Sequence, residues 1–420
     1  MHIGKVFSNY AGMPKEAKYI IYASILPTVA YGLVFTDLSY FLTTVQGVPA
    51  DFTGIVISAM GISTFVASIF LGIAADIYGR KKLLIVGNLL ASIILAALAL
   101  TTDPVLLIGV AIFEGIAEAA VLASSNALLA DKVESEKRTS LFSLYGFVQS
   151  LAFGLGSFAV PFVIAFELVG FTNKDSHILL YVLIAILGAV STLIMLRVSE
   201  SKKLKKLKTG KTDFLPRKSK DVLLKYVLTS AIIAFGAGMV VPLMTLWFNL
   251  QYGISDTISA PILAASSMLV AFATLAAPWV AKKFGLVKAT VITQVVSTPF
   301  MFFVPFSPNY ALAGIVYSMR ALLMNMASPL SQSMIMALVA EDERGAVSGI
   351  SGALWRLPNA LSTFIGAWLM GIGLLAEPFF IATLLYIISI ILFWHYFRKV
   401  KMPEEKVTDS KTGYSKGTSG

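Results

Sequence analysis

Long apolar segments alternate with short polar ones along nearly the whole chain. Twelve of these segments carry few charges, and each is long enough to cross roughly 30 Å of hydrocarbon as a helix. We place them at residues 18–42, 54–76, 83–101, 105–130, 140–166, 178–197, 222–250, 259–281, 287–306, 310–336, 345–373 and 376–397. The pattern therefore predicts an all-α membrane protein with twelve transmembrane helices.

A strongly cationic stretch separates the first six segments from the last six. It covers residues 198–221 and lacks apolar periodicity. It reads either as a cytoplasmic tether lying along anionic lipid headgroups or as a simple solvated linker. The predicted organisation is then an N-terminal segment (1–17), a six-helix bundle (18–197), the basic linker (198–221), a second bundle (222–397) and a tail (398–420).

Composition and charge placement support the membrane assignment. The chain is 57% hydrophobic and 13% charged, whereas a soluble protein carries about a quarter charged residues. The net charge of +10 could indicate nucleic acid, but of the 33 Lys and Arg only Lys174 falls in an outer loop, while Arg320 and Arg356 lie inside segments. This distribution follows the positive-inside rule. It predicts a plasma-membrane protein with both termini cytoplasmic and no nucleic-acid partner.

Several kinds of chemistry are not expected. The chain has no cysteine, and its three histidines lie near predicted span ends or in a tail, so we expect neither a thiolate nor an imidazole metal site. No nucleophile motif, metal cluster or phosphate-cradling loop is found in the sequence. We therefore expect no enzymatic activity and no cofactor.

The turn between the second and third segments carries the most specific motif. It reads GIAADIYGRKK at residues 72–82, with Gly72 allowing close helix approach, Gly79 permitting a positive φ, and Arg80 and Lys81 holding the turn at the cytoplasmic surface. A basic hairpin between two spans is the plain alternative. The spacing G-x-x-x-D-x-x-G-R-K resembles the signature loop between helices 2 and 3 of the major facilitator superfamily of secondary transporters.

The two halves of the chain also align on each other with one ungapped shift. A shift of 206 residues pairs four anchors: Gly79 with Gly285, Arg138 with Arg344, Gly32 with Gly238, and Gly146 with Gly352. Two parallel six-helix repeats, with a substrate site at their interface near the bilayer midplane, are the architecture that the resemblance implies.

The resemblance also implies a role for the basic loops. In the family the signature aspartate, here Asp76, helps hold the halves together in the outward-open state near the start of helix 11. That helix begins here next to Arg344, where its N-terminal dipole favours an anion. Arg80 and Arg138 are candidate partners of Asp76. The alternative is that Arg80 and Lys81 only determine topology.

Five ionisable residues fall inside or near the core of predicted spans, where a charge costs several kcal/mol and is a functional candidate. Glu114 and Glu118 are spaced i, i+4, so their carboxylates share one helix face about 6 Å apart. Away from water both cannot ionise cheaply, which suits a proton carrier. Asp37 is a third proton-coupling candidate, or a hydrated group at the outer vestibule.

The cations lie in the second half. The 206-residue shift places Glu114 on Arg320, and Glu118 and Arg356 share a depth of about 17 Å from the cytoplasmic end at 1.5 Å per residue. We expect an acidic wall to face a cationic wall, or else permanent ion pairs that only fix packing. Candidate substrate-binding residues are Arg320, Arg356, Glu118, Tyr317, Trp355 and Asn126.

The sequence thus predicts a monomeric secondary active transporter that moves a small organic solute by alternating access, coupled to protons. Its partners would be the solute, H⁺ and the lipid bilayer, with anionic headgroups at the basic loops. A proton-independent facilitator is the first alternative. A non-transporting sensor or scaffold on a transporter fold is the second.

Overall fold

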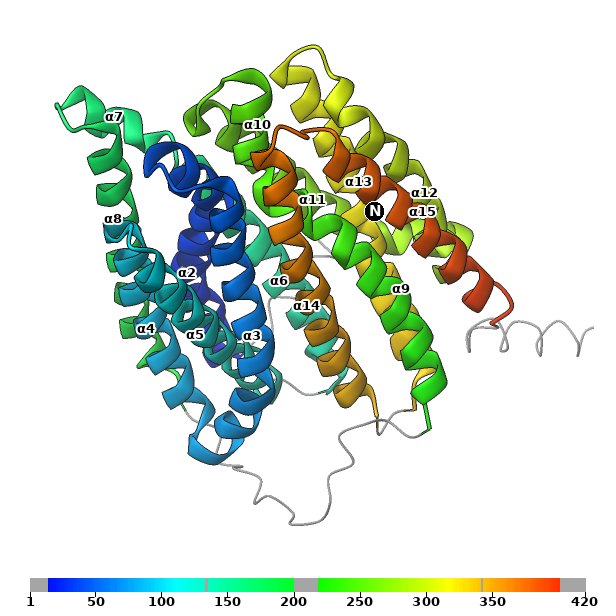
Figure 1. Cartoon of the computed structure of the whole chain (residues 1–420). Helices are drawn as coiled ribbons and strands as arrows, with labels where there is room; N and C mark the ends of the chain where they lie inside the picture. Colours follow the sequence, from blue (N-terminus) through cyan, green and yellow to red (C-terminus); the bar gives the residue numbers. More distant parts are fainter. Residues whose placement is uncertain (1–13, 133–134, 200–217, 341–342, 401–420) are drawn as a thin grey trace, which may run out of the picture.

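The computed structural model describes residues 14–132, 135–199, 218–340 and 343–400, and all regular structure in these ranges is helical. The helices run side by side in an elongated bundle (Figure 1). The side chains of Asp76, Arg138 and Arg344 lie outside the described part, although their backbones belong to helices. The all-α fold class is confirmed.

The described residues of the first half form eight elements, which are α2 (Lys15–Tyr40), the π-helical turn η1 (Phe41–Val45), α3 (Ala50–Tyr78), α4 (Arg80–Leu100), α5 (Pro104–Asp131), α6 (Ser135–Phe158), α7 (Phe162–Leu168) and α8 (Asn173–Met195). Those of the second half form nine, which are α9 (Lys220–Gly238), η2 (Val241–Leu243), α10 (Met244–Tyr252), α11 (Asp256–Phe284), α12 (Leu286–Phe303), η3 (Val304–Phe306), α13 (Tyr310–Leu338), α14 (Arg344–Gly371) and α15 (Glu377–Phe397).

Eleven helical stretches of the described residues are long and apolar enough to cross a membrane, and each matches a predicted span. The remaining predicted span is α14, which has 28 residues but carries Arg356, Pro358 and Asn359 in its middle turns. Its apolar character is lowered by these polar residues. Its length and its packing along α3 and α9 nevertheless make it a full member of the bundle.

Two spans are broken at proline. The chain turns at residues 159–161, and α7 begins directly after Pro161. Likewise α9 ends at Gly238, and Pro242 lies in the short η2 before α10 begins. A proline lacks the N–H that a helix interior needs, and its ring clashes with the preceding turn. Each break therefore follows from the sequence locally.

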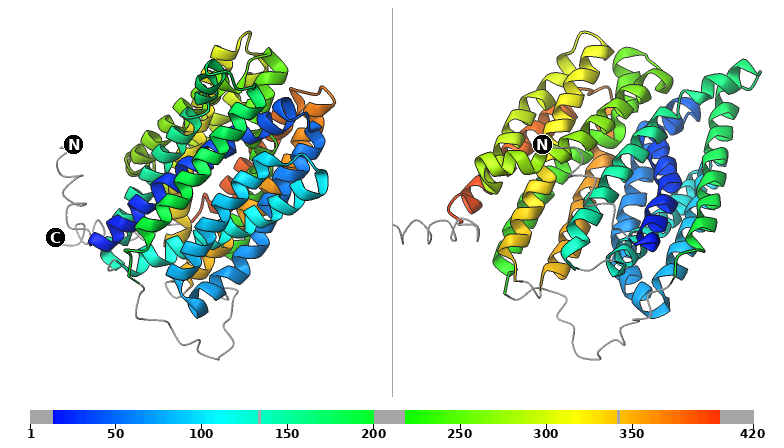
Figure 2. Two further views of the ribbon diagram at one scale, coloured as in Figure 1. Left: turned by 90° about the vertical axis from the view of Figure 1, so that its left-hand side faces the viewer. Right: turned by 180° about the vertical axis from the view of Figure 1, so that it is seen from behind.

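The two halves meet along two pairs of helices. Figure 1 shows α2 to α8 gathered on one side and α9 to α15 on the other, and Figure 2 gives the same arrangement from the side and from behind. At the boundary α3 packs along α14, and α6 packs along α11. A Cβ added at Gly61 of α3 would lie 2.6 Å from the Cβ of Ala360 on α14, so the backbones approach closely there.

The bundle has two distinct ends. We call the end where α8 finishes at Met195 and α9 begins at Lys220 the linker end, and the other the far end. A Cβ built on Gly72, Gly146 or Gly352 would meet nothing within 4 Å among the described residues. These glycines lie toward the linker end of α3, α6 and α14. Among the described residues, the close contacts between the halves therefore lie in the middle and at the far end.

Apolar side chains cover the outside of the bundle as well as its interior. Phe70, Leu168 and Trp279 are 65%, 84% and 68% exposed. In water such a surface would be costly, whereas lipid accepts it. Each half also has its own core, with Phe41 and Tyr181 fully buried in the first and Trp247 and Phe379 in the second.

Candidate functional site

A cavity of about 980 Å³ lies between the halves. Its wall includes four of the five predicted intramembrane charges, which are Glu114, Glu118, Arg320 and Arg356. It reaches toward the linker end, where Ile20 of α2 and Tyr226 of α9 line it, and toward the far end, where Leu38 of α2 and Thr245 of α10 line it. The sequence prediction that the charges face a common space is met for these four residues.

Glu118 and Arg356 join the two halves directly. Arg356 Nη1 on α14 donates to Glu118 Oε1 on α5 at 3.0 Å, and the Thr64 hydroxyl lies 3.0 Å from Glu118 Oε2. The Arg356 side chain is 33% exposed and the Glu118 side chain 20%. The pair is therefore an ion pair in contact with the cavity, and both carboxylate oxygens of Glu118 have partners.

Glu114 lies one turn away from Glu118 on the same face of α5, as its spacing predicts. Its Oε2 atom is buried and has no hydrogen-bond partner among the described residues. A buried carboxylate oxygen without a partner carries its full desolvation cost when it is ionised. Of the two acids, Glu114 is thus the one whose charge the described residues do not compensate.

Arg320 is surrounded by neutral groups. Its side chain is 4% exposed, its guanidinium donates to the hydroxyl of Tyr386 on α15, and it lies over the rings of Tyr317 and Tyr386 at 5.8 and 5.5 Å from their centroids. Its Nε atom has no partner, and in the described part of the chain no carboxylate pairs with it. Ring faces attract a cation but do not neutralise it. The cavity wall therefore carries a buried positive charge that lacks a counter-ion.

The remaining predicted binding residues differ in whether they line the cavity. Tyr317 and Trp355 line the cavity, as expected. Asn126 does not: its side chain is exposed on α5, and it is not part of the cavity wall. At 3.6 residues per turn, Ser125 falls on the face of Glu118 and Asn126 is turned about 80° away from it. The structure therefore does not bring Asn126 to the cavity, and its role in binding stays a prediction.

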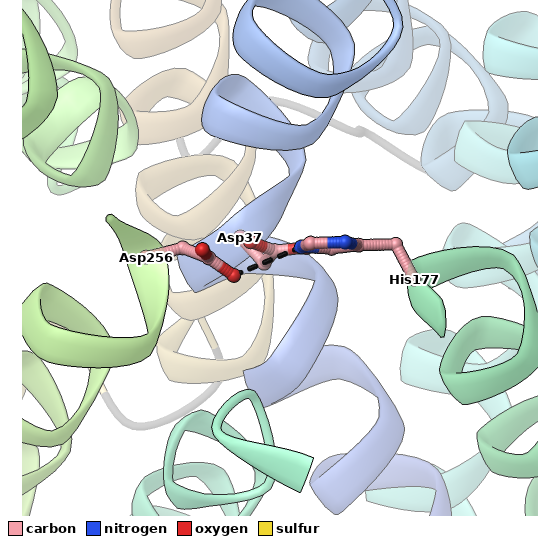
Figure 3. A group of neighbouring side chains, drawn as sticks. All are labelled: Asp37, His177 and Asp256. Atoms are coloured by element: carbon pink, nitrogen blue, oxygen red, sulfur yellow. Dashed lines mark hydrogen bonds and ion pairs between the residues drawn. The ribbon is translucent and has the colours of Figure 1, made fainter. Parts of the chain in front are cut away.

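Asp37 lies apart from the cavity charges, in a cluster toward the far end. Asp37 on α2, His177 on α8 and Asp256 on α11 each place one ligand-type atom within 4.8 Å of the others. Figure 3 shows the three side chains pointing toward one another from three helices. Their exposures are 0%, 0% and 1%, so Asp37 is not the hydrated vestibule group that the sequence left open.

The contacts in this cluster are polar and specific. His177 Nε2 lies 2.9 Å from Asp256 Oδ2, and His177 Nδ1 lies 2.8 Å from the backbone oxygen of Asn173. The Tyr181 hydroxyl donates to Asp37 Oδ2 at 3.1 Å. The other carboxylate oxygens, Asp37 Oδ1 and Asp256 Oδ1, are buried without a partner among the described residues.

Sequence reasoning missed three residues. His177 and Asp256 belong to the far-end cluster, and Tyr386 contacts Arg320 at the cavity. His177 and Asp256 stand in the first turns of α8 and α11, where the sequence resembles an ordinary span end. Tyr386 lies in an apolar helix with no motif around it. The sequence offered one signal for His177 and Asp256, because both are ionisable residues at the far ends of spans. They belong to different halves, and only the packing brings them together.

The signature turn behaves as its glycine predicts. Gly79 has a φ of 101° and separates α3 from α4, and its repeat partner Gly285 has a φ of 76°. No described atom lies within 4 Å of a Cβ built on Gly72, so the close helix approach expected there stays a prediction. Arg80 donates to the backbone oxygen of Ala127 at 3.3 Å.

Lys81 similarly donates to the backbone oxygen of Leu196 at 2.8 Å. Both acceptors lie at or near the C-terminal ends of helices, where cations are favoured by the helix dipole. The other three members of the predicted gating set, Asp76, Arg138 and Arg344, have side chains outside the described residues.

Known proteins share this fold and, in part, this sequence. A family model described as Major Facilitator Superfamily matches residues 20–363. The uncharacterised MFS-type transporter YqjV of Bacillus subtilis (strain 168) is 28% identical over 155 residues, a match that covers 34% of this chain and 38% of that protein. The match thus spans less than two fifths of that relative.

Three solved structures are similar over most of both chains. A mutant of the nucleoside transporter NupG has a TM-score of 0.76 at 15% identity and covers 91% of this chain and 100% of its own. A bacterial homologue of the human lysosomal transporter Spinster, inward-facing and occupied, has a TM-score of 0.73 at 13% identity with 91% and 96% coverage. A D-xylose–proton symporter has a TM-score of 0.70 at 16% identity with 90% and 97% coverage.

At these identities the structural likeness shows the fold alone, and the family model adds the sequence relationship. Together with the membrane-spanning helices, the two halves and the cavity between them, they fix the assignment. The chain belongs to the major facilitator superfamily of membrane transporters.

Proposed function

We propose that the chain is a proton-coupled secondary active transporter for a small organic solute that carries an anionic group. The observation that carries this proposal is the charge pattern of the cavity. Its wall contains a buried arginine and a buried glutamate oxygen, one from each half, and neither has an ionic partner among the described residues. A solute that enters the cavity supplies what these two groups lack.

Arg320 is the proposed anchor for the solute's anionic group. A planar guanidinium binds a carboxylate or phosphate through two parallel hydrogen bonds, and such charge-assisted bonds are about twice as strong as neutral ones. The Tyr317 and Tyr386 rings that flank Arg320 supply an apolar wall beside it. Trp355 and the Glu118–Arg356 pair complete the proposed binding surface.

Glu114 is the proposed proton carrier. The ion pair already occupies Glu118, whereas Glu114 keeps a free oxygen in the cavity wall. A proton on Glu114 removes the repulsion between the two acids and balances the anionic charge brought by the solute. Asp37, the third sequence candidate, belongs to the far-end cluster and is not needed for this step.

The proposed mechanism is alternating access, and the shape of the site supports it. The cavity reaches toward the linker end, while α3–α14 and the far-end contacts hold the halves together. We propose that the membrane is the plasma membrane and, from the positive-inside rule, that the linker end is cytoplasmic, so that this conformation faces inward. Opening the far end and closing the linker end would bring Asp76 toward the start of α14 in the other half, as the resemblance implies.

The same fold also serves facilitators, so the coupling needs its own test. Structures with this fold include proteins named as a nucleoside transporter and as a D-xylose–proton symporter. Both names describe small organic solutes, and only one of them includes a proton. The proton-independent facilitator therefore remains the second candidate, favoured if Glu118 stays paired and Glu114 stays charged throughout the cycle.

The experiment is transport into liposomes containing the purified full-length protein, with and without an imposed proton gradient, from a mixed pool of organic anions, amino acids and neutral sugars. We expect a solute with an anionic group to accumulate against its gradient. Glu114→Gln should abolish this accumulation but retain exchange of labelled for unlabelled solute, because a neutral amide mimics the protonated acid.

Asp103→Asn is the matched control, since Asp103 only caps the start of α5 at the far end. If Glu114→Gln leaves the accumulation intact, Glu114 is not the carrier. If flux in the parent ignores pH, the protein is a facilitator. If no solute in the pool is transported, the result favours the non-transporting sensor or scaffold.

A further inference from the structure

The far-end cluster brings two carboxylates and one imidazole together, and no Lys or Arg of the described residues pairs with them. The Asn173 carbonyl can only accept a hydrogen bond, so His177 Nδ1 carries the hydrogen and donates it. In the neutral ring Nε2 then bears a lone pair, and it points at the Asp256 and Asp37 carboxylates (Figure 3). Acceptors brought together in a dry interior need a positive charge between them.

A proton is a poor solution for this arrangement. One proton on His177 Nε2 serves the contact to Asp256 Oδ2 and leaves Asp37 Oδ1 and Asp256 Oδ1 unpartnered. With one proton the group also keeps a net negative charge, because two carboxylates face one imidazolium, so two protons would be needed where one divalent cation suffices. A divalent cation neutralises both carboxylates while the ring stays neutral, and it contacts all three side chains at once.

We propose that Asp37, His177 and Asp256 form a binding site for a divalent transition-metal cation of the Zn²⁺ class. One imidazole nitrogen and two carboxylate oxygens are ligands that Zn²⁺ accepts at about 2.0–2.2 Å, with a fourth position left for water or a second carboxylate oxygen. Ligand atoms within 4.8 Å of one another are close enough to converge on one ion after small side-chain movements.

The surroundings of the cluster match those of metal ligands. A ligating histidine almost always donates its other ring N–H to a carbonyl or carboxylate, as His177 does to Asn173. Ligating carboxylates are themselves hydrogen-bonded, as Asp37 is by Tyr181. The Phe41 ring stacks on the His177 ring at 5.6 Å between centroids and fixes its orientation.

The site would join the two halves of the transporter. Asp37 and His177 belong to the first half, and Asp256 belongs to the second. The neighbouring Thr44–Asn249 hydrogen bond, at 3.2 Å, also crosses between the halves at this end. A bound cation would therefore hold the far end closed and slow the change to the other conformation. This inference does not depend on the identity of the solute or on proton coupling.

The test uses the full-length protein purified through a tag without histidine, stripped with a chelator and embedded in lipid nanodiscs. Zn²⁺ is titrated in, and bound metal is counted by mass spectrometry, with Mn²⁺, Ca²⁺ and Mg²⁺ as comparison ions. We expect one Zn²⁺ per chain. Asp256→Asn keeps the shape of the side chain but removes a charged ligand, and it should weaken binding at least about tenfold.

His395→Gln is the matched control, because His395 is exposed near the linker end of α15 and far from the cluster. It should bind Zn²⁺ as the parent does. Nitroxide labels report the conformation separately. The chain has no cysteine, so labels at Lys174→Cys and Tyr310→Cys, both exposed and at the far end of opposite halves, are unambiguous. Zn²⁺ should narrow their distance distribution in the parent but not in Asp256→Asn.

Three results would overturn the proposal. The first is a parent protein that does not retain Zn²⁺ at micromolar concentration. The second is an Asp256→Asn variant that binds as tightly as the parent, which would indicate adventitious binding elsewhere. The third is a label distance that follows pH in the presence of chelator and ignores Zn²⁺, in which case protons alone serve the cluster.

Discussion

Two contacts between a carboxylate and a basic side chain join the halves in the described part of this transporter, and they differ in their access to water. The Glu118–Arg356 pair lies in the cavity, with 20% and 33% of the side chains exposed. The His177–Asp256 contact lies toward the far end, with 0% and 1% exposed. A carboxylate thus meets a basic side chain twice in one molecule, once in contact with the cavity and once in a dry interior.

The difference predicts different roles for the two contacts. A hydrated ion pair can open cheaply, because water replaces the lost partner and the Coulomb attraction is weak at high dielectric constant. A dry pair cannot open unless its charges are neutralised or exposed to water together. The cavity pair is therefore suited to exchange partners with a solute, and the far-end cluster is suited to hold one conformation.

The largest expected effect is on the dry contact. His177→Ala leaves the Asp37 and Asp256 carboxylates buried without the imidazole, and removing one partner of a buried polar pair costs about 3–5 kcal/mol. We expect a clear fall in the apparent melting temperature of the purified protein in detergent. His395→Ala, at an exposed site, should melt with the parent. If the two variants melt together, the cluster does not stabilise this conformation.

The next effect concerns the solute. Arg320→Ala removes the proposed anchor, and a hydrogen bond to a charged group contributes about 1.5–3 kcal/mol, or roughly a 10- to 100-fold loss of apparent affinity. Uptake of the solute identified in liposomes measures this as a rise in KM. Arg320→Lys keeps the charge but not the planar fork, so it should recover part of the affinity.

Arg197→Ala is the matched control for this change, because Arg197 is exposed at the linker end and outside the cavity wall. The opposite result is a protein that takes up a neutral solute equally well with and without Arg320→Ala. That result would contradict the proposed anionic group and leave the transporter assignment intact.

The sequence predicted the architecture because its signals are local. Apolar length, charge placement and the turn at Gly79 each depend on a few consecutive residues, and the structure confirms the helices and the positive φ. The facing of Glu118 and Arg356 was also predictable, since depth along a helix follows from counting residues. The membership of α14 in the bundle followed from its length despite its polar middle.

What the sequence did not predict depends on rotation and on distant packing. Asn126 lies beside a cavity-facing residue in the chain but is turned away from it on the helix. Asp256 and His177 come together only because α8 and α11 meet from different halves. The open space beside Gly72 reflects the conformation, which a single sequence does not specify for a protein with two states.

A pair of glycines on one helix tests where the halves are in contact. A Cβ at Gly61 would lie 2.6 Å from the Ala360 Cβ, so Gly61→Ala forces α3 and α14 apart and should destabilise the protein by about 1–3 kcal/mol. Gly72→Ala fills open space and should stabilise α3 by about 0.5–1 kcal/mol. Thermal melts of both variants measure the contrast, and equal shifts would contradict the arrangement of closed far end and open linker end.

We expect the smallest effect on stability for the Glu118–Arg356 pair in the cavity. A double-mutant cycle with Glu118→Gln and Arg356→Gln measures the coupling between the two side chains free of their other contacts. Because both remain partly exposed to the cavity, we expect a coupling of about 0–1 kcal/mol in melting experiments. A coupling of several kcal/mol would mean that the cavity pair is effectively dry, and that it locks this conformation just as the far-end cluster does. The pair would then be structural, and solute binding at that level would have to rely on Arg320 alone.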